Sequence, residues 1–195
     1  MFLRTNLILI IFLFFSCITR VENLALPSVF SDYMVLQRET EVSFWGKSSP
    51  NEKIEIRGSW GKSSSVKADT SGKWELNLAT PSAGGPYEVV VNDSKNSILY
   101  KDVLIGEVWL ASGQSNMQWK LNQCKDCLDN QDEEIKNANY NEIRFFNNPM
   151  DLSGTIINSQ KWKTVNSKSA SEMEDSFSTE NYSAVGYFFA KELYN

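Results

Sequence analysis

Hydrophobic and polar residues alternate in short runs along the first half of the chain, and glycine, proline and asparagine separate these runs. Alternation with a period of two places one side of a strand in a core and the other side in solvent. Short strands separated in this way by turn residues are typical of an antiparallel sandwich. We therefore predict an antiparallel β-sandwich domain over residues 24–105, with strands at 41–45, 53–57, 65–68, 73–78, 87–91 and 98–105.

The pattern changes near Gly106. Residues 108–111 are a continuous apolar run, Val-Trp-Leu-Ala, which indicates a parallel strand buried on both faces. Farther on, the pattern predicts a helix at 132–139, a strand at 142–146 and a helix at 182–194 with apolar side chains at helical spacing. Because strand, helix and strand in this order begin an α/β layer structure, residues 106–195 are predicted to be the first part of an α/β domain. The fold class is therefore mixed.

Residues 1–23 have the pattern of an export signal. Arg4 precedes a short apolar run at 7–15, and this run is too short to span a bilayer as a stable helix. The pattern predicts an exported protein, periplasmic or extracellular. Cys17 follows the apolar run directly, so a lipoprotein signal is an alternative in which Cys17 carries the lipid and brings the protein to a membrane.

The composition indicates a globular chain and excludes some partners. A hydrophobic content of 42% in 195 residues is enough for a core, and the net charge of −5 without a basic stripe argues against nucleic acid. The aromatic content of 12%, with six tryptophans, is compatible with a carbohydrate partner. Tryptophan and tyrosine in a β-rich chain also serve as core and cross-strand residues, so this observation alone decides little. No cofactor is predicted.

Cys124 and Cys127 form the one C-x-x-C motif of the chain. A zinc site would need further ligands, and the chain has no histidine and only Cys17 besides this pair, so no metal site is predicted. A redox role would need the motif at a helix N-terminus after a strand, and the sequence does not place the motif there. In an exported chain we interpret the pair as a small local disulfide, provided that the geometry permits it.

Ser115 stands where the apolar run at 108–111 would be followed by a helix. A serine on such a turn presents its hydroxyl, and its backbone N–H can meet developing negative charge, as a nucleophile and an oxyanion donor require. The alternative is a polar loop with an N-capping serine. Gln114 either orients the turn or contacts substrate, and Asn116 either makes a local hydrogen bond or contacts substrate.

Two strings resemble a known family. The first is Gly-Glu-Val-Trp-Leu-Ala-Ser-Gly-Gln-Ser-Asn-Met at 106–117, and the second is Leu-Pro-Ser-Val-Phe-Ser-Asp-Tyr-Met-Val-Leu-Gln at 26–37. Together they resemble the sialate O-acetylesterase family of carbohydrate esterases, in the SGNH-hydrolase superfamily with its flavodoxin-like α/β domain. The resemblance implies that Ser115 attacks an acetyl ester on a sugar and forms an acetyl-enzyme. The second glycine of G-x-S-x-G is missing at 117, which favours the SGNH type over the lipase type.

The chain contains no histidine, although serine hydrolases ordinarily need an imidazole to accept the hydroxyl proton. In the family that the chain resembles, the acid and base lie in an Asp-x-x-His block near the end of the catalytic domain, and the other oxyanion donors lie in later blocks. We therefore predict a fragment truncated at its C-terminus and inactive alone. The alternative is a secreted protein without catalysis, in which residues 24–105 bind carbohydrate or serve as a scaffold.

Four acidic residues lie together at the start of the helix predicted for 132–139: Asp129, Asp132, Glu133 and Glu134. A pair of carboxylates is the apparatus of glycoside hydrolysis. Consecutive carboxylates at a helix start more often complement the helix dipole and face solvent. We interpret the group in this second way.

Overall fold

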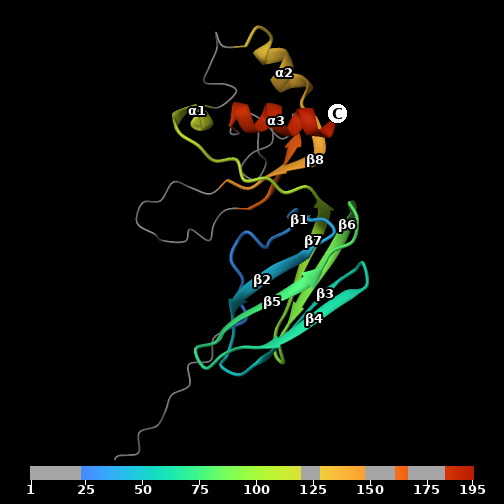
Figure 1. The fold of residues 1–195 in the computed structure, drawn as a ribbon, viewed down its shortest axis with the longest axis vertical. Coiled ribbons are helices and arrows are strands. Elements are labelled where there is room, and N and C mark those ends of the chain that lie inside the picture. The colour runs from blue at the N-terminus through green and yellow to red at the C-terminus, as the bar shows by residue number, and fades with distance from the viewer. Residues whose placement is uncertain (1–22, 120–127, 148–160, 167–182) are drawn as a thin grey trace, which may run out of the picture.

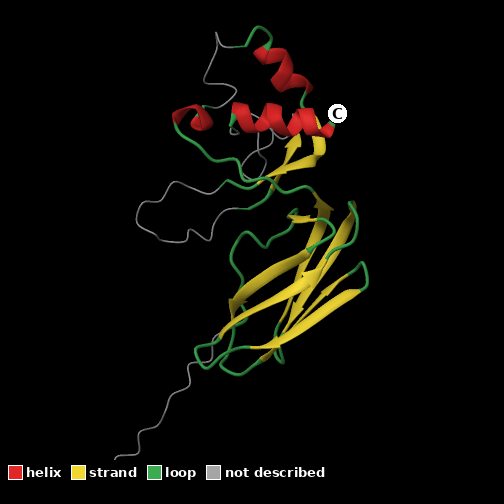
Figure 2. Ribbon diagram, viewed as in Figure 1, coloured by secondary structure: helices red, strands yellow, loops and turns green. Residues whose placement is uncertain are grey.

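The computed structural model describes residues 23–119, 128–147, 161–166 and 183–195. The strands of the first half of the chain form one end of the molecule, and the helices lie at the other end together with a two-stranded sheet (Figures 1 and 2). The elements in order are β1 Val35–Gln37, β2 Glu41–Lys47, β3 Lys53–Gly58, β4 Lys62–Lys67, β5 Lys73–Ala79, β6 Gly84–Asn92, β7 Ser97–Gly106, α1 Ser115–Gln118, α2 Gln131–Asn137, β8 Asn139–Phe145, β9 Lys163–Asn166 and α3 Ala184–Tyr194. Residues 1–22 of the predicted signal segment, with Cys17, and the pair Cys124 and Cys127 lie outside the described residues.

Strands β1 to β7 form two sheets around one core. The larger sheet has the order β1-β7-β6-β3-β4, and β2 pairs with β5. Strand β4 also lies against β5, so the strands curl around the interior. Both sheets contribute to a single group of buried apolar side chains, among them Phe44, Leu78, Ile54, Ile56, Val89, Val91 and Val103. The alternation visible in the sequence is therefore the alternation of core and surface residues.

The six predicted strands are all present, with bounds that shift by a few residues. Strand β1 was not predicted, and it pairs with β7 in parallel, Val35 beside Leu104 and Gln37 beside Gly106. The larger sheet is therefore mixed, and the prediction of purely antiparallel strands is wrong at this edge. A three-residue strand is too short to show alternation, and its partner lies far along the chain.

Beyond β7, the helices predicted at 132–139 and 182–194 and the strand at 142–146 are confirmed as α2, α3 and β8. Strand β8 pairs with β9 in the antiparallel direction, so the described residues do not show the parallel layer that we predicted. Helix α3 packs on this pair through Tyr187. The Tyr187 side chain is fully buried and belongs to one apolar cluster with Ile143 and Val165. None of the described helices is long and apolar enough to cross a membrane.

The predicted buried strand at 108–111 is wrong. The segment has no regular structure, and Leu110 is 92% exposed. A continuous apolar run forms a buried strand only where other strands pair with it, and no strand among the described residues does so. Instead, Trp109 meets Phe189 of α3 edge-on, with 5.3 Å between the ring centroids. The run 108–111 therefore lies beside helix α3 and not in a sheet.

The two ends of the molecule are joined by side chains of the later segment. Arg144 of β8 donates from Nη2 to Asp102 Oδ1 at 2.8 Å and from Nη1 to the carbonyl oxygen of Asp102. Its guanidinium also lies over the ring of Tyr33, 5.5 Å from the centroid. Trp162 donates from Nε1 to the carbonyl oxygen of Val29 at 2.7 Å. These contacts hold the β8–β9 pair against β7 and the segment before β1.

Candidate active site

The two strings at 26–37 and 106–117 lie side by side. Gln37 donates from Nε2 to Glu107 Oε2 at 3.0 Å, and its Oε1 accepts from the backbone N–H of Val108 at 2.8 Å. Arg38 donates from Nε to Glu107 Oε1 at 2.6 Å. The parallel pairing of β1 with β7 therefore brings together motifs that are about 70 residues apart in the chain.

These contacts fix the start of the segment that leads to Ser115. Hydrogen bonds from Gln37 and then Arg38, with the positive charge of Arg38, hold the pKa of Glu107 below its usual value. The carboxylate is therefore ionised and accepts from both side chains at neutral pH. Sequence reasoning missed this role of Gln37 and Glu107, although Gln37 ends one recognised string and Glu107 is the second residue of the other.

Ser115 is the first residue of α1 and is exposed. Gln114 is the N-cap residue, with φ −105° and ψ −155°, and its carbonyl oxygen accepts from the N–H of Met117 at 2.9 Å. The alternative of an N-capping serine at 115 is therefore wrong, because the cap position belongs to Gln114. Among the described residues, no group forms a hydrogen bond with the Ser115 hydroxyl.

The turn that carries Ser115 is held by the start of α3 (Figure 1). Ser183 caps α3 by accepting from the N–H of Gly186 at 3.2 Å, and its hydroxyl also contacts Met117 Sδ at 3.4 Å. The N–H of Ala184 donates to the carbonyl oxygen of Trp119 at 2.8 Å. A single helical turn is not stable alone, so these contacts explain why α1 forms.

Gly113 lets the segment before α1 approach the helix. A Cβ at this position would lie 3.0 Å from Met117 Cγ, which is closer than ordinary packing permits. Met117 in turn is half-buried and contacts Ser183. Gly113 and Met117 therefore shape the turn on both sides of Ser115.

The side chains of Gln114 and Asn116 are exposed, like that of Ser115. The backbone N–H of Ser115, at the first position of α1, has no partner within the helix and is free to donate outward. A helix of one turn contributes little dipole, so any stabilisation of an oxyanion here comes from this N–H itself. Whether Gln114 and Asn116 contact a substrate stays a prediction.

One residue of the acidic group at the start of α2 does not face solvent, contrary to our interpretation. Glu134 faces α3, where Oε1 accepts from Tyr187 Oη at 2.6 Å and from Lys191 Nζ at 2.5 Å. Partial burial by itself would raise the pKa of Glu134, but the hydrogen bonds from Lys191 and Tyr187 outweigh it and lower the pKa. Glu134 therefore joins α2 to α3 as an ionised acceptor and does not face solvent.

In the part of the chain that the structure describes, no group of histidine, cysteine, aspartate or glutamate side chains is arranged to hold a metal ion. The chain as a whole has no histidine. The described site therefore consists of an exposed hydroxyl and an outward N–H on a braced turn.

Comparison with known proteins gives relatives of one kind. No family model matches the chain. A sialate O-acetylesterase from Mus musculus is 33% identical over 130 residues, which are 61% of this chain and 23% of that protein. The sialate O-acetylesterase of Homo sapiens is 30% identical over 184 residues, which are 86% of this chain and 34% of that protein. The chain is homologous to the sialate O-acetylesterases.

A solved structure agrees with this homology. A carbohydrate acetylesterase from Xanthomonas citri matches with a TM-score of 0.76 and 36% identity, over 88% of this chain and 37% of that one. The resemblance that the two strings indicated is thus confirmed, and the mixed fold of this sialate O-acetylesterase homologue is shared with a solved enzyme. The chain spans about a third or less of the length of the curated relatives that it matches.

Proposed function

We propose that this chain carries the nucleophile of a carbohydrate O-acetylesterase, and that the nucleophile is Ser115. The homology to sialate O-acetylesterases and the likeness to a carbohydrate acetylesterase support the reaction class. The observation that supports the residue is its position: Ser115 is exposed at the first position of a turn that Met117 and Ser183 hold in place. The substrate class is an acetylated carbohydrate.

The reaction is an acyl transfer of the SGNH type. Ser115 Oγ attacks the acetyl carbonyl carbon, and the resulting oxyanion accepts from the backbone N–H of Ser115. Collapse of this intermediate breaks the bond between the acetyl carbon and the sugar oxygen, which takes up a proton and leaves as the sugar hydroxyl. The acetyl-enzyme remains, and water releases acetate from it. The hydroxyl proton needs an acceptor, and these 195 residues contain no imidazole. We therefore expect no ester hydrolysis from these residues alone.

We also propose an organisation of the chain and a location for it. Residues 24–105 are a β-domain that contacts the start of the segment leading to the nucleophile, and residues 106–195 are the first part of an SGNH domain. Residues 1–23 direct export to the periplasm or the extracellular space. A fusion of residues 1–30 to a reporter enzyme that is active only outside the cytoplasm tests the export signal, and replacing the apolar run at 7–15 with polar residues should abolish the reporter activity.

Hydrolysis of 4-nitrophenyl acetate and of acetylated xylan tests the catalytic proposal. The 195-residue chain is compared with the longest product that its gene encodes. We expect hydrolysis only from a product that contains a histidine base, and we expect Ser115→Ala to lower its kcat by at least about 10³-fold. Ser65→Ala, at an exposed position on β4, is the control and should leave kcat unchanged.

Two results would contradict the proposal. Turnover by the 195-residue chain that Ser115→Ala removes would show that no histidine is needed. A longer product that contains a histidine base but has neither turnover nor fluorophosphonate labelling of Ser115 would favour the alternative, a sugar-binding or scaffold protein without catalysis.

A further inference from the structure

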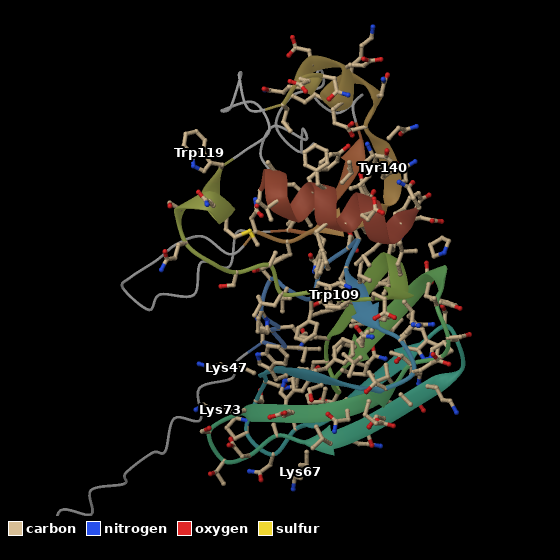
Figure 3. All side chains as sticks on the ribbon, turned by 45° about the horizontal axis from the view of Figure 1, so that its top comes forward. Lys47, Lys67, Lys73, Trp109, Trp119 and Tyr140 are labelled. Atoms are coloured by element: carbon tan, nitrogen blue, oxygen red, sulfur yellow. The ribbon has the colours of Figure 1, made fainter. Side chains whose placement is uncertain are left out.

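A pocket of about 710 Å³ lies at the end of the β2–β5 pair. It is lined by Trp45 and Lys47 of β2, by Lys73 and Glu75 of β5, by Asp69 and by the segment 25–27. Figure 3 shows Lys47 and Lys73 near each other, far from Trp119 at the end of α1. The pocket is therefore separate from the site of Ser115.

Trp45 gives the pocket a fixed aromatic surface. Its side chain is 43% exposed, although large aromatic side chains contribute most when they are buried. The ring meets Phe30 edge-on at 4.7 Å, and Phe30 is buried and stacked on Phe44. The indole ring is thus held by the core while much of its surface remains open, as a binding platform requires.

The register of the two strands places charged groups around this ring. Trp45 lies opposite Glu75, and Lys47 lies opposite Lys73. Like charges directly opposite each other on a sheet are unfavourable. Neither ammonium group forms an ion pair with another described residue, so both retain their hydrogen-bond donors for a ligand.

Two further groups complete the lining. Asp69 accepts at Oδ1 from the hydroxyl and the N–H of Ser71 and from the N–H of Lys73, and these bonds, the Ser71 hydroxyl first, lower its pKa. Its carboxylate is therefore ionised and held in position. Trp74, which also lines the pocket, is buried, and its indole N–H has no hydrogen-bond partner among the described residues.

We propose that this pocket binds a neutral pyranose unit of a glycan. The apolar face of a sugar ring packs on an indole, and its hydroxyls accept from ammonium groups and donate to carboxylates. Two lysines and two carboxylates balance in charge, which suits a hydroxylated neutral ring better than an anion. The volume is in the range of small-molecule sites. The pocket would hold a glycan chain independently of any reaction at Ser115.

Tryptophan fluorescence and isothermal titration calorimetry test this proposal on the 195-residue chain. The probes are xylohexaose and cellohexaose as neutral glycans, hexagalacturonic acid as an anionic glycan, and a decapeptide of glycine and serine. We expect saturable binding of a neutral hexasaccharide. Trp45→Ala should weaken it at least about tenfold, the change that 1.4 kcal/mol produces, and the double variant Lys47→Ala/Lys73→Ala should also weaken it.

Two matched variants separate the pocket from the rest of the surface. Lys67→Ala on β4 and Trp109→Ala replace residues of the same types outside the pocket and should leave the affinity unchanged (Figure 3). If Trp45→Ala does not fold, the double lysine variant, which changes only exposed side chains, carries the test. The proposal is overturned if no neutral hexasaccharide binds, if the anionic glycan or the peptide binds more tightly, or if the control variants lose affinity equally.

Discussion

Nη2 of Arg144 lies 2.8 Å from Oδ1 of Asp102, and this ion pair joins β8 to β7. The two partners differ in environment, because the side chain of Arg144 is only 5% exposed whereas that of Asp102 is 42% exposed. Arg144 also donates to the carbonyl oxygen of Asp102 and lies over the Tyr33 ring. Arg144 is therefore a buried connection between the two ends of the molecule.

Replacing Arg144 should destabilise the fold. Arg144→Met keeps the apolar stem but removes the hydrogen bonds, and we expect it to lower the free energy of unfolding by about 1–3 kcal/mol in urea titrations. Asp102→Asn should cost less, since asparagine keeps an acceptor and tolerates the left-handed φ of 54° at this position. Arg57→Met, which breaks an exposed pair with Glu55, is the control and should cost less than about 1 kcal/mol.

Glu134 should make the stability of the fold depend on pH in the acid range. Because its pKa is lowered in the folded state, its contribution is present above its ordinary pKa of 4.5 and is lost as the pH falls through the lowered value. Glu134→Gln should therefore lower stability by about 1–3 kcal/mol at pH 7 and flatten the decline below pH 4.5. Urea unfolding at several pH values measures this, with Glu133→Gln on the exposed face of α2 as the control. Equal slopes in all three proteins would contradict the expectation.

The contact of Lys191 with Glu134 should also make the stability of the fold depend on pH in the alkaline range. The hydrogen bond to Glu134, followed by its charge, raises the pKa of Lys191 above the ordinary value of 10.5 despite some burial. A raised pKa contributes stability that is fully present below the ordinary value and is lost as the pH rises through the folded one. Lys191→Met should therefore lower stability at pH 9 and reduce its decline above pH 10.5. A decline of the same size in the variant and the parent would show that Lys191 does not contribute.

Gly46 should tolerate no side chain. A Cβ there would lie 2.2 Å from the carbonyl oxygen of Ala25 and 2.8 Å from Trp74 Cζ2. Gly46→Ala should displace the segment 25–27, break the bridge of Ala25 to Lys47 and cost about 1–3 kcal/mol in thermal unfolding. Gly106→Ala, whose Cβ would meet only Val35 Cγ1 at 3.9 Å, should stay within about 0.5 kcal/mol of the parent.

Substitutions at Leu110 and Ile105 distinguish the observed structure from the sequence prediction of a buried strand. Leu110 is exposed and Ile105 is buried. Leu110→Ser should change the free energy of unfolding of the 195-residue chain by less than about 0.5 kcal/mol, whereas Ile105→Ala should cost about 2–5 kcal/mol. A large loss from Leu110→Ser would mean that the apolar run is packed after all.

The sequence predicted the strands whose side chains alternate. Val89 and Val91 of β6, like Ile54 and Ile56 of β3, face the core at every second position, so a local pattern was sufficient. Helix α3 was also predicted, although the buried side chain is Tyr187 and the apolar residues Val185, Phe189 and Leu193 are exposed. Periodicity identifies a helix more reliably than it identifies the face that another element covers.

Features that depend on distant partners were not predictable. Strand β1 forms because it pairs with β7, and the position of Glu107 depends on its hydrogen bond with Gln37. The run at 108–111 has the composition of a buried strand but no strand beside it in the described residues. Ser115 was proposed as the nucleophile from its own string, whereas the contact of Met117 with Ser183 that braces its turn joins residues 66 apart. Such contacts leave no local pattern.

The pairing of β1 with β7 has a consequence for protein engineering. Gln37 and Arg38 hold Glu107 from across the boundary that the sequence suggested at residue 105. A chimaera that grafts the serine segment onto a foreign β-domain would lose these anchors unless the residues at 35–38 were transplanted with it. The strings at 26–37 and 106–117 must therefore be transferred together, and a cut between residues 105 and 106 separates them.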